Sequence, residues 1–163
     1  MVSSVQIRIA NRQDEKKIVE FVEAIFSEHN SKLDLTSVDA DLKNVEANYF
    51  GKDGAFLVAE HEQKIVGVAA ANMIDENTCA LRRIYVAKDF RRKGLASEML
   101  SGVISILRRL DYKKLIVHDT LWDAMKADAS SRKEAESFLQ SARFKIAQPG
   151  SAQGSSCLEL ILV

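Results

Sequence analysis

The sequence predicts an α/β protein in which one mixed β-sheet is covered by helices on both faces. Short apolar runs of strand-like composition alternate with segments whose apolar residues recur every three or four positions. The predicted elements follow the order β-α-α-β-β-β-α-β-α-β-β, which combines hairpins with helical crossovers. No long linker interrupts the 163 residues, so we expect a single domain over residues 1–163.

The N-terminal part is predicted to contain one strand and two helices. Residues 5–9 alternate apolar and polar side chains, as a half-buried strand does. Residues 11–14 supply capping side chains for a helix that runs to about Glu28 with helical apolar spacing. A second helix is expected after a cap at Ser37 or Asp39. Its apolar face would consist of Leu42, Val45 and Tyr49.

Three strands and a long helix are predicted in the middle of the chain. Residues 55–59 and 65–71 are apolar runs on either side of a charged turn, which is typical of a hairpin. A third strand fits residues 79–86. The basic loop 88–93 then leads into an amphipathic helix over residues 95–110.

The C-terminal part is predicted to add a strand, a helix and a hairpin. Residues 114–118 are a short apolar strand, followed by a longer connection at 120–131. A last helix is expected over residues 132–142. The terminal hairpin would pair residues 143–147 with residues 156–163 across a loop that is rich in glycine and serine.

Composition and charge argue against several classes of partner. Lys plus Arg (23) equals Asp plus Glu (23), whereas nucleic-acid-binding domains usually carry a basic excess, so we expect no nucleic-acid partner. No apolar run reaches the about 20 residues of a membrane helix, and residues 1–8 contain no apolar core of the kind that a signal sequence has. We therefore expect a cytoplasmic protein without a membrane partner. Cys79 and Cys157 are too few for a disulfide framework and lack metal-ligand spacing, so no metal is expected.

The chemically most informative segment is residues 81–96, which runs from a strand through a basic loop into the start of a helix. The first N–H groups of a helix have no partner within the helix, and the helix dipole favours an anion there. Gly94 lets a ligand approach the backbone closely, and Ala96 is small. Positive charge is added by Arg91, Arg92 and Lys93. The segment therefore predicts a pyrophosphate site, with a solvated basic surface as the alternative.

This segment resembles the acetyl-CoA-binding motif of the GCN5-related N-acetyltransferase (GNAT) family, Arg/Gln-x-x-Gly-x-Gly/Ala directly after a strand. Arg91, Gly94 and Ala96 match the motif, and residues 84–86 resemble the strand end before it. The resemblance implies the GNAT fold and acetyl-CoA as cosubstrate. Pantetheine would lie along the 79–86 strand, which separates from the 114–118 strand to leave a gap for the thioester. The implied cosubstrate-binding residues are Ile84, Tyr85, Val86, Arg91, Arg92, Lys93, Gly94, Leu95, Ala96 and Ser97.

The reaction that the resemblance implies is direct attack of an amine on the thioester carbonyl. It needs a base for the amine, a donor for the carbonyl oxygen and an acid for the thiolate. The donor would be the amide of Ile84 or Val86. His118 is the candidate base because it ends the strand beside the gap, and imidazole is the side chain that most often serves as a general base. The alternative is that His118 only hydrogen-bonds Asp119 or solvent.

The acid is where the chain departs from the family. Many members carry a Tyr-x-x-x-Gly-Phe pattern in the last helix, and here Leu139 and Arg143 occupy the Tyr and Gly positions before Phe144. Tyr85 could replace the missing acid or could simply be a packing residue. Water remains a further proton source for the thiolate.

Two functions follow from these observations. The first is an N-acetyltransferase that acts on a primary amine of a small molecule or a peptide, as a monomer or homodimer. The second is a non-catalytic acyl-CoA-binding module of the same fold. The acceptor would bind near residues 20–49 and Trp122. The acidic residues of that region would suit a cationic acceptor or could be surface charges: Glu23, Glu28, Asp34, Asp39 and Asp41.

Overall fold

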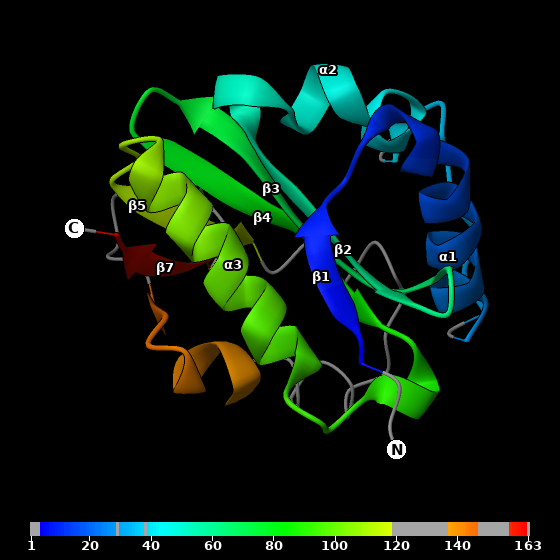
Figure 1. Ribbon diagram of the computed structural model, residues 1–163. Helices are drawn as coiled ribbons and strands as arrows, with labels where there is room; N and C mark the ends of the chain where they lie inside the picture. Colours follow the sequence, from blue (N-terminus) through cyan, green and yellow to red (C-terminus); the bar gives the residue numbers. More distant parts are fainter. Residues whose placement is uncertain (1–3, 29, 38, 119–136, 147–156, 163) are drawn as a thin grey trace.

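A computed structural model describes residues 4–28, 30–37, 39–118, 137–146 and 157–162. Their strands form one seven-stranded sheet in the order β1-β2-β3-β4-β5-β7-β6 (Figure 1). Helices cover both faces of this sheet, so the predicted α/β class and element order are confirmed.

The N-terminal elements begin with β1 (Gln6–Ile9), which pairs antiparallel with β2 at the edge of the sheet. Asn11 and Asp14 form a capping box, and α1 (Glu15–Ser27) follows. The prediction of one continuous second helix is wrong. The segment divides into a 3-10 turn, η2 (Ala40–Lys43), and a short α2 (Val45–Tyr49). Asn44 causes the division, because its backbone leaves the helical region (φ −148°, ψ 81°) and its side chain caps α2.

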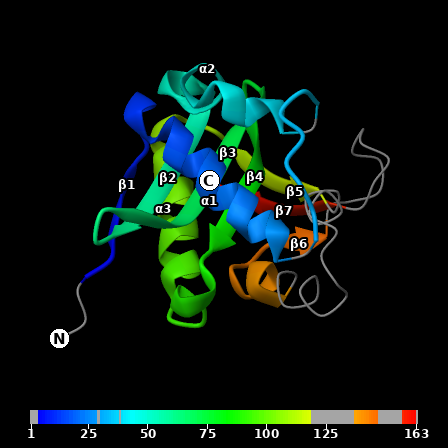
Figure 2. The same ribbon diagram turned by 90° about the vertical axis from the view of Figure 1, so that its right-hand side faces the viewer.

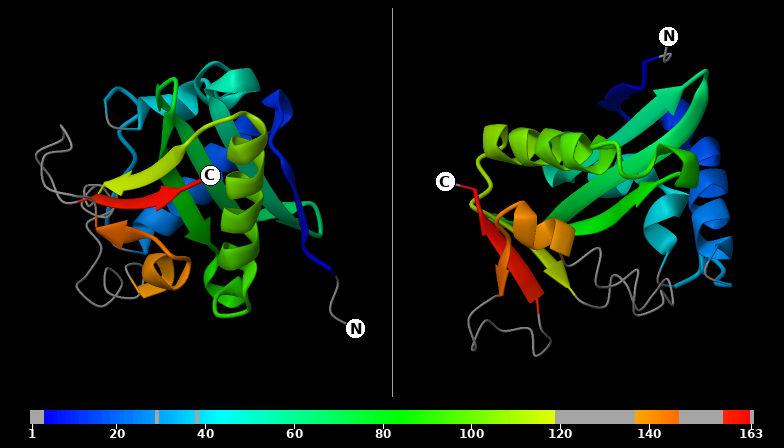
Figure 3. Two further views of the ribbon diagram at one scale, coloured as in Figure 1. Left: turned by 90° about the vertical axis from the view of Figure 1, so that its left-hand side faces the viewer. Right: turned by 90° about the horizontal axis from the view of Figure 1, so that it is seen from below.

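The centre of the sheet consists of β2 (Gly54–His61), β3 (Lys64–Asp75) and β4 (Thr78–Val86), with β3 antiparallel to both β2 and β4. β3 extends beyond the predicted residue 71 because it pairs with β4 as far as Asp75 and Thr78. The helix α3 (Leu95–Arg109) packs on one face of these strands, and α1 and α2 pack on the other (Figure 3).

The C-terminal side of the sheet starts with β5 (Lys114–His118), which runs parallel to β4 and has the predicted bounds. β7 (Cys157–Ile161) pairs antiparallel with β5, and β6 (Lys145–Ile146) pairs with β7. Residues 137–141 are helical and directly precede β6 (Figure 2). The predicted connection at 120–131 lies outside the described residues.

The core lies in two layers, one on each face of the sheet, and both include residues of β4 and its neighbours. On one face, α3 contributes Met99, Val103 and Leu107 to the core. On the other face, α1 contributes Phe26 and α2 contributes Tyr49, and all five side chains are fully buried. Among the described residues, no helix has both the length and the apolar character that crossing a bilayer requires.

Candidate functional site

The start of α3 is open to a ligand. Gly94 is the N-cap residue and has a left-handed conformation (φ 84°, ψ 2°), with no side chain capping the helix. A Cβ atom built on Gly94 would have nothing within 4 Å. The amide of Glu98 donates to the Gly94 carbonyl at 3.1 Å, so the amides of residues 95–97 precede the first helical hydrogen bond. This end of α3 therefore offers aligned N–H donors to an anion.

Arg91 holds the loop before α3 in place. Its Nε donates to the Val86 carbonyl at 2.8 Å, and its Nη2 lies 2.6 Å from Oε2 of Glu28 at the end of α1. Lys93 Nζ lies 5.9 Å from the ring centroid of Phe90, a cation–π distance. The Arg91 guanidinium thus links the loop to β4 and α1, which the sequence analysis did not anticipate.

One edge of β4 is open beyond its first residues. β5 pairs with β4 only from Thr78 to Ala80, and the two strands then point apart (Figure 3). The amide of Ala87 donates to the Val66 carbonyl at 2.8 Å, towards β3. Backbone groups alternate between the two edges of a strand, so the amides of Ile84 and Val86 face the edge that β5 has left. The backbone groups expected to hold pantetheine and the acyl oxygen are therefore on that edge.

A β-bulge interrupts β4 next to this opening. Ala70 of β3 pairs with Arg83 and Ala71 with Leu81, which leaves Arg82 as an extra residue. Arg82 is exposed and its Nε donates to Asn72 Oδ1 at 2.7 Å, whereas Arg83 is only 5% exposed. The bulge therefore gives two consecutive arginines very different surroundings.

Arg83 forms the centre of a buried polar cluster between β4 and η2. Its Nη2 lies 2.9 Å from Asp39 Oδ1 and 2.6 Å from Asp41 Oδ1. Asp41 also accepts a hydrogen bond from the Tyr49 hydroxyl. Burial raises the pKa of Tyr49 well above its ordinary value, and the Asp41 charge raises it further. Both carboxylates are thus satisfied inside the protein.

This cluster corrects one interpretation of the sequence. Asp39 and Asp41 bind Arg83, and Glu28 binds Arg91, so these carboxylates are not a free set for a cationic acceptor. Arg83 is itself buried, so its charge is not on the surface. The sequence contained the residues of the cluster but no signal for the bulge that brings them together.

Tyr85 lies within the core and packs edge-on against Phe26, with ring centroids 6.0 Å apart. Burial raises the pKa of its hydroxyl, although the nearby Arg83 charge opposes this shift. The sequence left Tyr85 either as a replacement acid or as a packing residue. The ring contact and the burial support the packing role.

His118 is half-buried at the end of β5, two residues beyond the last pair with β4. Side chains alternate along a strand, so His118 shares a sheet face with Ile116 and with its partner Ala80. Asp119, the alternative partner of His118, lies outside the described residues, as do Trp122 and its neighbours. The role of His118 as a base stays a prediction.

Leu139, which the family resemblance aligns with the Tyr position, lies in the last helix. Leu139 is fully buried, and its carbonyl accepts from the Phe144 amide at 3.1 Å. Arg143, which the resemblance aligns with the Gly position, has a positive φ of 75°, a conformation that glycine adopts more readily than arginine. Within the described parts of the chain, no group of His, Cys, Asp and Glu side chains could hold a metal ion.

Comparison with protein families places this geometry in context. A profile of the acetyltransferase (GNAT) family matches residues 16–128, more than half of the chain. Human N-acetyltransferase 8 is 29% identical over 83 residues, which cover 47% of this chain and 37% of that protein. The match therefore spans little more than a third of the human relative.

Solved structures show the same fold. A GNAT-family acetyltransferase from Staphylococcus aureus Mu50 superposes with a TM-score of 0.81 at 23% identity, covering 98% of this chain and 100% of that one. The protein yncA from Salmonella typhimurium, solved with its cofactor acetyl-CoA, has a TM-score of 0.72 at 18% identity, with 99% and 95% coverage.

Proposed function

The chain belongs to the acetyltransferase (GNAT) family, and from this premise we propose that it transfers an acetyl group from acetyl-CoA to a primary amine. The observation that carries the proposal is the position of the Gly94-capped end of α3 beside the open edge of β4. The start of α3 can hold a pyrophosphate, and the open edge of β4 can hold an extended pantetheine arm.

The residues present fit acetyl-CoA. The open space at Gly94 and the amides of residues 95–97 suit two linked phosphates, because backbone donors at a helix start bind such oxygens well. The β4 edge offers the Ile84 amide and carbonyl and the Val86 amide, while the Val86 carbonyl is used by Arg91. An extended amide-containing arm would add to this edge in the way that a peptide strand does. The superposed yncA structure, solved with acetyl-CoA, supports this assignment.

The proposed step forms one bond and breaks one. The neutral amine nitrogen attacks the thioester carbonyl carbon, the C–N bond forms, and the C–S bond breaks to release the CoA thiolate. The amine loses a proton to a base, and the thiolate gains one. The amide of Ile84 or Val86 stabilises the carbonyl oxygen while negative charge develops on it.

The chain's own residues assist this step unequally. His118 is the proposed base, acting directly or through one water molecule, because it ends β5 at the side of the opening. Leu139 cannot donate a proton, so the thiolate is protonated by water. Most of the rate enhancement is therefore assigned to positioning of the two substrates and to the backbone donor.

A second candidate function is binding of acyl-CoA without transfer. The observation that favours it is the apolar, fully buried Leu139 at the position where many members carry an acid. In that case the protein would bind acetyl-CoA tightly and release no thiol in the presence of any amine.

One experiment separates these functions. The purified protein is incubated with acetyl-CoA and primary amines that include diamines, free amino acids and lysine peptides, while free thiol and acetylated product are measured. We expect both to appear in equal amounts with at least one amine. In His118→Gln, we expect a lower rate with the amines that the native protein acetylates. Release of thiol without acetylated product would contradict the acetyltransferase function. So would the absence of both thiol and product with every amine.

A further inference from the structure

We infer that Arg82 binds a carboxylate of the acceptor, so that the acceptor class is the small amino acid rather than the polyamine. This inference rests on the proposed function. It starts from the bulge in β4, which leaves one exposed arginine just beyond the place where β4 and β5 part.

The location of Arg82 is the first step. The last β4–β5 pair is Ala80 with Ile116, so Arg82 lies just beyond the point where the strands separate. Between Cys79 and Val86 it is the single exposed residue of β4. Asn72 lies two residues from Ala70, the partner of Arg83, so Asn72 and Arg83 share a face of the sheet. Arg82 donates to Asn72 Oδ1 at 2.7 Å and therefore lies on this face, where Arg83 binds Asp41 of η2.

The charge balance of this face is the second step. Asp39 and Asp41 have side chains only 2% and 16% exposed, and both are bound to Arg83. Arg82 donates its Nε to the neutral Asn72 amide oxygen and has no carboxylate partner among the described residues. Among the described residues, the exposed charged group of β4 beside the opening is thus a cation, which would repel a polyamine.

The chemistry of the guanidinium is the third step. With Nε engaged by Asn72, the planar group is held in one orientation, and its two terminal nitrogens can bind a carboxylate through two parallel hydrogen bonds. A carboxylate bound here would orient an attached amine at the opening between β4 and β5. An amino acid carries its amine and its carboxylate on one carbon atom, so a carboxylate bound to Arg82 would hold the amine close to the start of the opening.

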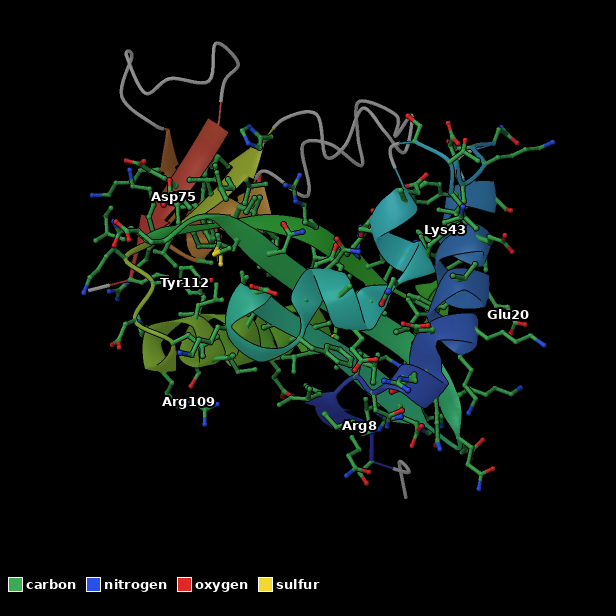
Figure 4. The ribbon with its side chains drawn as sticks, turned by 90° about the horizontal axis from the view of Figure 1, so that it is seen from above. Arg8, Glu20, Lys43, Asp75, Arg109 and Tyr112 are labelled. Atoms are coloured by element: carbon green, nitrogen blue, oxygen red, sulfur yellow. The ribbon has the colours of Figure 1, made fainter. Side chains whose placement is uncertain are left out.

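The test compares each free α-amino acid with its methyl ester and its decarboxylated amine as acceptors. The proteins are the native chain, Arg82→Gln and Arg82→Lys, with Arg109→Gln as the matched control. Arg109 is an exposed arginine at the end of α3, on the far side of the molecule from Lys43 of η2 (Figure 4). A parallel calorimetric titration of the amino acids into the CoA-saturated proteins measures binding without turnover, and circular dichroism checks folding.

We expect kcat/KM for at least one amino acid to exceed that of its ester and amine by about 10- to 100-fold, the range for a hydrogen-bonded charged group. Arg82→Gln should remove this preference, mainly through KM, and Arg82→Lys should retain part of it. Arg109→Gln should behave as the native protein.

Each other outcome has a definite meaning. Transfer to amines with no preference for the carboxylate, or a preference that survives in Arg82→Gln, would overturn this inference and leave the acetyltransferase function intact. No transfer, but amino-acid binding to the CoA complex that is lost in Arg82→Gln, would support the site and contradict the transferase function. Absence of both preference and binding would overturn the inference.

Discussion

The buried cluster around Arg83 makes a strong prediction about stability. Arg83→Met removes the guanidinium and leaves Asp39 and Asp41, whose side chains are 2% and 16% exposed, without a cation. Removing one partner of a buried ion pair costs about 3–5 kcal/mol, because the remaining charge has lost its water and its counterion. A domain of this size typically has about 5–15 kcal/mol of stability, so the loss would be a large fraction of the total.

The assay is equilibrium unfolding in urea, followed by circular dichroism. Two comparisons make it specific. Arg12 forms an ion pair with Glu46 at the surface, with side chains 77% and 43% exposed, so Arg12→Met should cost less than about 1 kcal/mol. Adding Asp39→Asn and Asp41→Asn to Arg83→Met should recover much of the lost stability, because no buried charge then remains. A loss in Arg83→Met no larger than that in Arg12→Met would refute the reasoning.

Two further predictions concern titratable groups. The hydrogen bond from Arg8 lowers the pKa of Asp14, so its stabilisation is present above the ordinary carboxyl pKa and is lost as the pH falls through the lowered value. Asp14→Asn should therefore lower the urea midpoint of unfolding at about pH 6. The midpoint should also fall less between about pH 6 and about pH 3 in this variant than in the native protein. An equal fall in both proteins would contradict this prediction. Burial raises the pKa of Cys79 to about 12, so its thiol should resist iodoacetamide at about pH 8 until urea unfolds the protein. Mass spectrometry of the Cys79 peptide measures this, and rapid labelling of the folded chain would show that the thiol is accessible.

Much of the fold could be predicted because its signals are local. The strand at residues 114–118 has the predicted bounds, since a short apolar run with charged flanks has few alternatives. The start of α3 at Leu95 follows from Gly94, whose positive φ ends the preceding loop. The division of the second helix was missed, because Leu42, Val45 and Tyr49 are spaced as one helical face whether or not Asn44 interrupts it.

The site was predicted less completely, because its polar contacts join distant segments. The motif residues around Gly94 are local, and their helix-start geometry follows from them. The Arg83 cluster joins β4 to η2, and its members Arg83 and Asp41 are 42 residues apart in the sequence. Its formation depends on a bulge of one residue, and a shift of one residue reverses which arginine is buried. No pattern in a single sequence specifies that register.

The central claim is that the N-terminal end of α3 binds the phosphates of acetyl-CoA. Calorimetry on two matched variants tests this claim. Gly94→Glu puts a negative charge where the phosphates would lie. Gly51→Glu is the control, because Gly51 also has a positive φ (71°, against 84° for Gly94), and an added Cβ has nothing within 4 Å at either position. Both variants therefore carry the same added charge and a similar backbone strain.

We predict that the native protein and Gly51→Glu bind acetyl-CoA with similar affinity, whereas Gly94→Glu remains folded by circular dichroism and shows no binding. Binding that persists in Gly94→Glu, or its absence in the native protein, would contradict the claim.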